Sequence, residues 1–90
     1  MFSNGYLQFP TMLQSAEDKS FGEYIKYLRK CNGMTQVDLA VILNSNYQNV
    51  SSLERNKFGP SLAYIYRLSE AFNLSIVDFI QGFEDFKNQS

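Results

Sequence analysis

The sequence contains no histidine and no tryptophan, and Cys31 is its single cysteine. With one thiol and no imidazole, the chain lacks the groups for a nucleophile–base pair, a zinc site or an internal disulfide. A glycine-rich phosphate loop is also missing. The neighbouring carboxylates Glu84 and Asp85 lie near the predicted end of a helix, where solvated side chains are expected. We therefore predict that the protein is not an enzyme and that it holds no metal ion and no cofactor.

Long apolar runs are missing as well. No stretch approaches the ~18 apolar residues of a membrane span, and the chain does not open with the regions of a signal peptide. A lone cysteine is typical of reduced intracellular chains. The hydrophobic content of 44% and the aromatic content of 16% are those of a folded protein, and 90 residues allow one modest core. We expect one small cytoplasmic domain without membrane contact.

The net charge of −1 conceals an uneven distribution of charge along the chain. Residues 1–25 carry three acidic side chains and one lysine, for a net charge of −2. Residues 26–57 carry five basic and two acidic side chains, for +3, and residues 70–90 carry four acidic side chains and one lysine, for −3. Arg67 accounts for the remaining +1. A basic middle between acidic ends can bind an anion on one face, and the alternative is an ordinary solvated surface.

Residues 1–19 show no regular periodicity. Their large apolar residues are scattered among Gly, Pro, Ser and Asn, and are Phe2, Tyr6, Leu7, Phe9, Met12 and Leu13. Three interpretations stay open for this N-terminal extension: an arm that packs back on the domain, a segment that contacts a partner chain, or a partly disordered tail. The domain itself is expected at residues 20–90.

From Ser20 onward the pattern is helical, with short connections. We predict five helices, at about 21–31, 35–43, 47–54, 61–72 and 76–83. Three of them begin with a capping box, in which a Ser or Thr side chain accepts from a backbone N–H while an acidic residue three positions later bonds back. These pairs are Ser20 with Glu23, Thr35 with Asp38, and Ser75 with Asp78.

The stretch Asn44-Ser45-Asn46 divides what would otherwise be one helix. Each of these residues can bond its own backbone and forms helix poorly, so two helices are predicted. Asn44 is expected in the left-handed turn position, and Asn46 is expected to cap the next helix. The apolar residues on both sides then form one inward cluster, which consists of Leu39, Ala40, Leu43, Val50 and Leu53. The rest of helix 47–54 is polar apart from the ring of Tyr47.

Several motifs occur in a fixed order between residues 21 and 80. They are Arg29, Gly33, TQVDLA at 35–40, Val50, Leu53, ERNK at 54–57, Pro60-Ser61 and AFNLSIVDFI at 71–80. In this order and spacing they resemble the phage-repressor (Cro/repressor, or XRE-type) class of helix-turn-helix domains. Asn44, Asn56 and Asn73 stand where most members have glycine, and we expect all three at positive φ because Asn tolerates it best. The resemblance implies an all-α, five-helix repressor-like helix-turn-helix domain.

In such domains the helix corresponding to 47–54 lies in the DNA major groove, with its first residues at the base edges. The resemblance therefore implies that Tyr47, Gln48 and Ser52 face the bases. An amide such as Gln48 suits paired bonds to adenine, whereas a short hydroxyl discriminates little. The alternatives are a half-buried aromatic for Tyr47 and solvated surface for Gln48 and Ser52.

The same resemblance implies contacts with the DNA backbone. Gln36 corresponds to a phosphate anchor at the start of helix 35–43, where the helix dipole favours an anion. Arg29 and Glu54 correspond to an internal ion pair that ties the first helix to the end of the third. The residues expected at the DNA backbone are Arg29, Thr35, Gln36, Asn46, Asn49, Arg55, Asn56 and Lys57. Without DNA, cations such as Arg55 and Lys57 also favour the negative end of a helix.

These residues predict a sequence-specific, DNA-binding transcriptional regulator of bacterial or phage type, and specifically a repressor that occupies an operator. Because one short helix reads few base pairs, we expect a homodimer on a palindromic site of double-stranded DNA. The dimer surface is expected on the last helix, at Phe79, Phe83 and Phe86, with help from the N-terminal segment.

A protein-interaction module on the same scaffold, such as an antitoxin-like partner or an antirepressor, is the alternative. The sequence pI of 5.2 and the apolar first 19 residues favour it, since most DNA-binding domains are basic. The two functions differ in their dependence on salt, because phosphate contacts weaken steeply as salt rises and an apolar interface does not.

Overall fold

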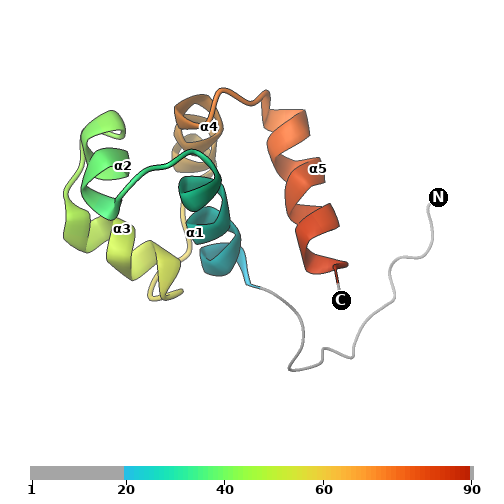
Figure 1. Ribbon diagram of the computed structural model, residues 1–90, viewed down its shortest axis with the longest axis horizontal. Coiled ribbons are helices and arrows are strands. Elements are labelled where there is room, and N and C mark those ends of the chain that lie inside the picture. Colours follow the sequence, from blue (N-terminus) through green and yellow to red (C-terminus); the bar gives the residue numbers. More distant parts are fainter. Residues whose placement is uncertain (1–19, 90) are drawn as a thin grey trace.

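The computed structural model describes residues 20–89, which fold into five α-helices with no strand among them (Figure 1). The helices are α1 (Phe21–Cys31), α2 (Gln36–Ile42), α3 (Tyr47–Glu54), α4 (Leu62–Ala71) and α5 (Ile76–Lys87). The predicted all-α, five-helix fold is confirmed, including the division at residues 44–46. Along the long direction of the molecule, α2 and α3 lie at one end, α1 and α4 in the middle and α5 at the other end. The predicted N-terminal extension, residues 1–19, lies outside the described residues.

Each helix begins after a polar side chain that caps its free N–H groups. The capping residues are Ser20, Thr35, Asn46, Ser61 and Ser75, and each accepts a hydrogen bond from the backbone N–H three positions later. At the first two helices the predicted capping box is complete, with Glu23 and Asp38 bonding back. The hydrogen bond from the Thr35 backbone lowers the pKa of the Asp38 carboxyl. A cap of this kind stabilises a helix by about 1 kcal/mol.

Four helix ends turn through a residue with positive φ. Gly33 follows α1 at φ 68°, and the same conformation is taken by Asn44 at 54°, Asn56 at 60° and Asn73 at 59°. The prediction for the three asparagines is confirmed. Their short polar side chain makes this region less costly than it is for most residues. The turn at Asn44 separates α2 from α3.

The core beneath α2 and α3 is aliphatic. Its members are the residues that the spacing predicted, and all are buried: Leu39, Ala40, Leu43, Val50 and Leu53. At the start of α1 the backbone approaches the end of α3 closely, since a Cβ on Gly22 would lie 2.5 Å from the carbonyl oxygen of Glu54. On the other side, the Arg67 guanidinium of α4 donates to the carbonyl oxygen of Leu43 at the end of α2. These contacts hold α3 against α1 and α2 against α4.

The core between α1 and α5 is aromatic. The ring centroid of Tyr24 lies 5.4 Å from those of Phe79 and Phe83 and 5.5 Å from that of Phe86. Its hydroxyl donates to the carbonyl oxygen of Phe79 at 2.7 Å. A Cβ on Gly82 would lie 2.5 Å from the same hydroxyl oxygen, so this glycine permits the close approach of α5. Burial raises the pKa of Tyr24 to about 12.

Two expectations about the last helix are wrong. Helix α5 continues beyond its predicted end at residue 83, because Phe86 is buried against α1 and adds a further turn of packing. For the same reason Phe79 and Phe86, at 0% and 7% exposed within one chain, are not available for the expected dimer surface, whereas Phe83 is only partly buried. The outer side of α5 instead presents Val77 and Ile80, which are 71% and 43% exposed.

Candidate nucleic-acid interface

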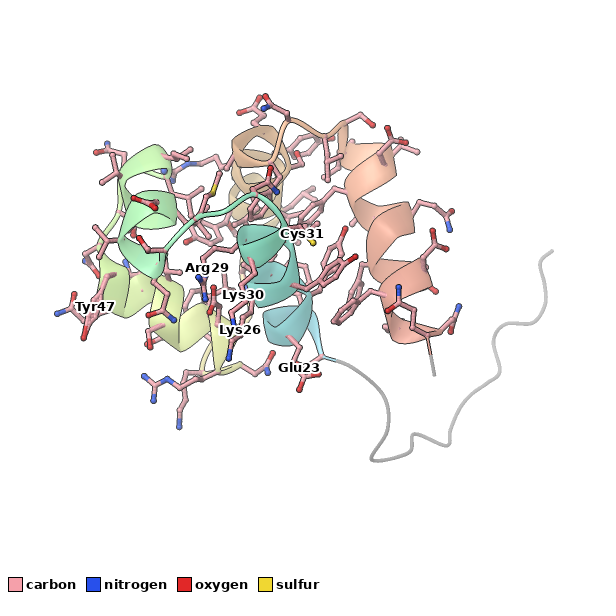
Figure 2. All side chains as sticks on the ribbon, viewed as in Figure 1. Glu23, Lys26, Arg29, Lys30, Cys31 and Tyr47 are labelled. Atoms are coloured by element: carbon pink, nitrogen blue, oxygen red, sulfur yellow. The ribbon has the colours of Figure 1, made fainter. Side chains whose placement is uncertain are left out.

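Helix α3 exposes its first turn and buries its opposite side. Tyr47 is 47% exposed and Gln48 is exposed, while Val50 and Leu53 are buried behind them. Ser52, one turn later, is half-buried. Figure 2 shows Tyr47 pointing outward at the end of the molecule away from α5. All three residues expected to face bases therefore retain access to solvent, and Ser52 has the least.

Arg29 and Glu54 form the ion pair that the resemblance implies. The Nε atom of Arg29 lies 2.6 Å from Oε2 of Glu54, and Nη2 donates to Oε1 at 3.0 Å. The guanidinium also donates through Nη1 to the carbonyl oxygen of Met34 at 2.8 Å, just before α2. The hydrogen bond to Glu54 raises the pKa of Arg29. Since both side chains of the pair are buried, the pair fixes the end of α3 relative to α1.

Gln36, in the first turn of α2, joins the same pair. Its Nε2 atom donates to Oε1 of Glu54 at 3.1 Å, so Glu54 receives hydrogen bonds from α1 and α2 together. The sequence did not predict this link. An amide nitrogen carries two N–H groups, and the bond to Glu54 uses one of them. The second can donate to an acceptor outside the protein, such as a phosphate oxygen.

Thr35 and Asn46, which cap α2 and α3, have part of their hydrogen-bonding capacity in use. The Thr35 hydroxyl accepts from the Asp38 N–H at 3.0 Å, and Oδ1 of Asn46 accepts from the Asn49 N–H at 2.9 Å. The Asn49 amide in turn donates to the hydroxyl of Ser45 at 3.0 Å. Capping uses acceptor atoms, so the hydroxyl hydrogen of Thr35 and the NH₂ group of Asn46 stay available as donors. Both lie on exposed residues next to Gln36 and Tyr47 in sequence.

Asn56 has a structural role that the sequence did not predict. Its Oδ1 accepts from the backbone N–H of Gly22 at 3.0 Å, and its Nδ2 donates to the hydroxyl of Ser20 at 2.9 Å. Its own N–H donates to the carbonyl oxygen of Leu53. Asn56 thus caps the start of α1 from the loop that follows α3. One amide hydrogen is left as a side-chain donor for a DNA backbone.

Arg55 and Lys57 flank Asn56 and are both exposed. The Nε of Arg55 donates to the carbonyl oxygen of Ser51 at 3.3 Å, which is the interaction expected of a cation at a helix end. Among residues 20–89, the Lys57 ammonium takes part in no ion pair. Lys57 therefore presents its full charge just beyond the C-terminal end of α3.

Lys26 and Lys30 on α1 are candidate residues that the assignment from the resemblance missed. They are one helical turn apart and exposed, and Figure 2 shows them beside Arg29 on the side of α1 nearest α3. Lys30 also lines an open groove of about 590 Å³ together with Arg29, Gln36 and Tyr47. The charge distribution already contained this signal, since both lysines belong to the basic middle of the sequence.

The charged side chains, which are unevenly distributed along the sequence, are also unevenly distributed over the folded domain. The basic side chains of the middle segment lie on α1 and just after α3, whereas the acidic side chains of residues 70–90 lie on α5, apart from Glu70 near the end of α4. Helices α3 and α5 are at opposite ends of the molecule (Figure 1). An approaching polyanion is therefore attracted to the side with α3 and repelled from α5.

The described part of the chain contains neither a candidate metal site nor a candidate membrane-spanning helix. Within residues 20–89, no three side chains of the metal-ligating types lie close enough to hold an ion. No helix in that range is both long and apolar enough to cross a membrane.

Comparison with known sequences assigns the chain to a family. Residues 25–79, more than half of the chain, match the model of the family described as Helix-turn-helix. A competence pilus inhibition repressor from Acinetobacter baylyi is 34% identical over 68 residues, which cover 76% of this chain and 62% of the repressor. An uncharacterised helix-turn-helix-type transcriptional regulator from Methanocaldococcus jannaschii is 33% identical over 54 residues, covering 60% of this chain and 82% of the regulator. The chain thus spans less than two thirds of the repressor's length.

Solved structures with a similar fold include proteins bound to DNA. The master regulator for biofilm formation SinR, in complex with DNA, matches with a TM-score of 0.61 and 27% identity, covering 68% of this chain and 98% of the SinR chain. The restriction-modification controller protein C.Esp1396I, a tetramer on its natural 35-base-pair operator, matches with a TM-score of 0.69 and 26% identity. That match covers 79% of this chain and 100% of the controller chain.

Proposed function

The chain belongs to the helix-turn-helix family of DNA-binding transcriptional regulators, and we propose that it recognises one DNA sequence through α3 and represses transcription by occupying that site. Proteins of this family act by binding rather than by catalysis. The first turn of α3 carries the proposal, because its polar side chains are exposed while its apolar side is packed in the core. A helix held in this way can enter the major groove without giving up core contacts.

The proposed base contacts come from Tyr47, Gln48 and Ser52. Gln48 is exposed, and its amide can donate to N7 and accept from N6 of one adenine. The ring of Tyr47 can contact a thymine methyl group, or its hydroxyl can bond a base edge or a phosphate. Ser52 is short and half-buried, so it reaches a base only when α3 lies deep in the groove. We therefore expect Gln48 to contribute most to sequence preference.

The proposed backbone contacts surround α3. On one side are Thr35, Gln36, Asn46 and Asn49, whose neutral donors fix the position of the helix on the duplex. On the other side are Arg55, Asn56 and Lys57, and the exposed Lys26 and Lys30 on α1 extend the same surface. Arg29 is buried in its pair with Glu54, so its proposed part is to support this surface from behind, with little access to a phosphate. The bond to Glu54 holds the Gln36 amide before DNA arrives, which lowers the entropy that a phosphate contact would otherwise cost.

We propose that the protein acts as a homodimer on a palindromic operator, with half-sites about 34 Å apart. The outer side of α5 is assigned to the dimer contact, because Val77 and Ile80 are exposed and line a shallow apolar groove of about 340 Å³. Val77→Glu is expected to shift the protein toward monomer in sedimentation equilibrium and to weaken operator binding. Val41→Glu is the control, since Val41 is equally exposed (72%) but lies on α2; a dimer that survives Val77→Glu refutes this surface.

Selection from randomised duplexes, followed by a salt titration on the selected sequence, tests the proposed function. We expect a palindromic consensus, and an affinity that falls steeply as salt rises because cations on the protein displace counterions from DNA. Failure to enrich any sequence, or an affinity insensitive to salt, contradicts the proposal. That outcome favours the protein-interaction module, which the acidic pI of 5.2 supports. As a regulator of transcription, the protein is placed in the cytoplasm of a bacterial or phage-infected cell.

A further inference from the structure

An open apolar groove lies where α1 begins, between α1, the loop after α3, α4 and α5. It has a volume of about 320 Å³, and its apolar walls are Phe21, Phe58, Pro60, Ile65 and Phe83. This volume lies at the lower end of the range for ligand pockets, about 300–1,000 Å³. Phe58 is 41% exposed, and its ring contacts Tyr64 edge-on at a centroid distance of 6.3 Å. Much of a large ring therefore faces water, and covering it would be favourable.

We propose that apolar side chains from residues 1–19 of the same chain pack into this groove. The segment joins the domain at Ser20, and the following residue, Phe21, is itself a wall of the groove. The Ser20 hydroxyl accepts from Nδ2 of Asn56, which also lines the groove, at 2.9 Å. The point of attachment is thereby fixed at the rim of the groove.

The chain between the attachment point and the apolar residues is short. Met12 and Leu13 precede Ser20 by eight and seven residues, and an extended chain spans up to ~3.3–3.6 Å per residue. Both side chains can therefore reach the groove without strain. A short flexible tether gives an effective concentration in the millimolar range. At micromolar protein this exceeds the concentration of any second copy, so the segment's own groove is its favoured binding partner.

Charges beside the attachment point favour the same arrangement. Glu17, Asp18 and Lys19 lie just before Ser20 in the sequence and carry a net charge of −1. Lys57 is exposed and follows the groove residue Asn56. Opposite charges at the rim contribute little by themselves at an exposed site, but their signs support docking at this end of the domain.

A double-mutant cycle on the full chain tests the proposal. The segment variant carries Met12→Ser and Leu13→Ser, the groove variant carries Phe58→Ala, and a third protein combines them. We expect each variant to lower the equilibrium constant for folding about tenfold, as partial burial of apolar side chains predicts. In the combined protein, the fold-decrease in this equilibrium constant should be at least threefold smaller than the product of the two separate fold-decreases. Val41→Ala, an exposed apolar residue on α2, is the control and should combine with the segment variant without coupling.

A second measurement uses the absence of tryptophan from the sequence. In the Leu13→Trp protein, docking predicts blue-shifted emission and weak quenching by acrylamide, and Phe58→Ala should reverse both. Additive losses in the cycle, or an emission typical of exposed tryptophan, overturn the proposal. If the coupling or the blue shift grows with protein concentration, the segment packs into the groove of a second copy of the chain. That result also overturns the proposal.

Discussion

Gly22→Ala tests whether the close contact of α1 with α3 is as tight as the structure shows. A Cβ at this position would lie 2.5 Å from the carbonyl oxygen of Glu54, 2.7 Å from that of Leu53 and 2.8 Å from the carbonyl carbon of Glu54. All three are backbone atoms at the end of α3, so no side chain can rotate away to make room. The start of α1 must shift, which strains the hydrogen bond from the Gly22 N–H to Asn56.

The size of the effect follows from two opposing terms. Overpacking in a well-packed region costs about 1–3 kcal/mol, and the higher helix propensity of alanine returns at most about 1 kcal/mol. With contacts this short we expect the upper part of the range, and a net loss of about 1–2 kcal/mol. In a domain of this size each kcal/mol lowers the melting temperature by about 4–8 °C. The variant should therefore melt roughly 4–16 °C below the wild type.

Thermal unfolding followed by circular dichroism measures this difference. Gly59→Ala is the matched control, because a Cβ there meets nothing within 4 Å, and its melting temperature should equal or slightly exceed that of the wild type. A Gly22→Ala protein that melts at the wild-type temperature or above it would refute the tight contact, and with it the fixed position of α3 against α1.

Gln48→Ala should relax preference at one base position and leave the melting temperature unchanged; an unaltered consensus in a randomised-duplex selection would contradict base reading. Lys57→Ala and Lys30→Ala should each weaken all DNA sequences alike and reduce the salt slope of binding by about 1. Lys87→Ala, on α5 and paired with Glu84, should leave that slope unchanged, and three equal slopes would exclude the proposed phosphate contacts. For Tyr24, the pKa in the folded protein is about 12, above the ordinary value of 10, so its neutral hydroxyl favours the fold below pH 10 and that contribution is lost as the pH rises through 12. Denaturant unfolding should show a smaller alkaline loss of stability in Tyr24→Phe than in the wild type, and an identical loss in both proteins would show that burial of this hydroxyl does not matter.

The polar surface of α3 was predictable because it follows from one local pattern. Val50 and Leu53 are apolar at helical spacing, so they had to face the core, and Gln48 then had to face away from it. Tyr47 lies three positions before Val50, at the edge of the buried side, and the sequence left open whether its ring would be half-buried. The ion pair of Arg29 with Glu54 came from the family resemblance, since no local rule connects positions 25 residues apart.

Other links were missed because they join distant positions through side chains of ordinary surface types. The bond of Gln36 to Glu54 spans 18 residues, and that of Asn56 to Gly22 spans 34. An amide gives no sequence signal for the partner it will meet after folding. The aromatic residues of α5 posed a related problem: their spacing showed an apolar face, but the sequence did not show that α1 would cover it.

The sequence by itself determined where helices start and turn, because capping and left-handed turns depend on hydrogen bonds and sterics within three or four neighbouring residues. Ser20, Thr35 and Asn46 cap, and Asn44, Asn56 and Asn73 turn, as their local chemistry requires. Only the tertiary structure decided which apolar face is covered and which amide is already bonded. Those outcomes depend on how whole helices pack, so Phe86 is buried against α1 while Val77 stays exposed on the same helix.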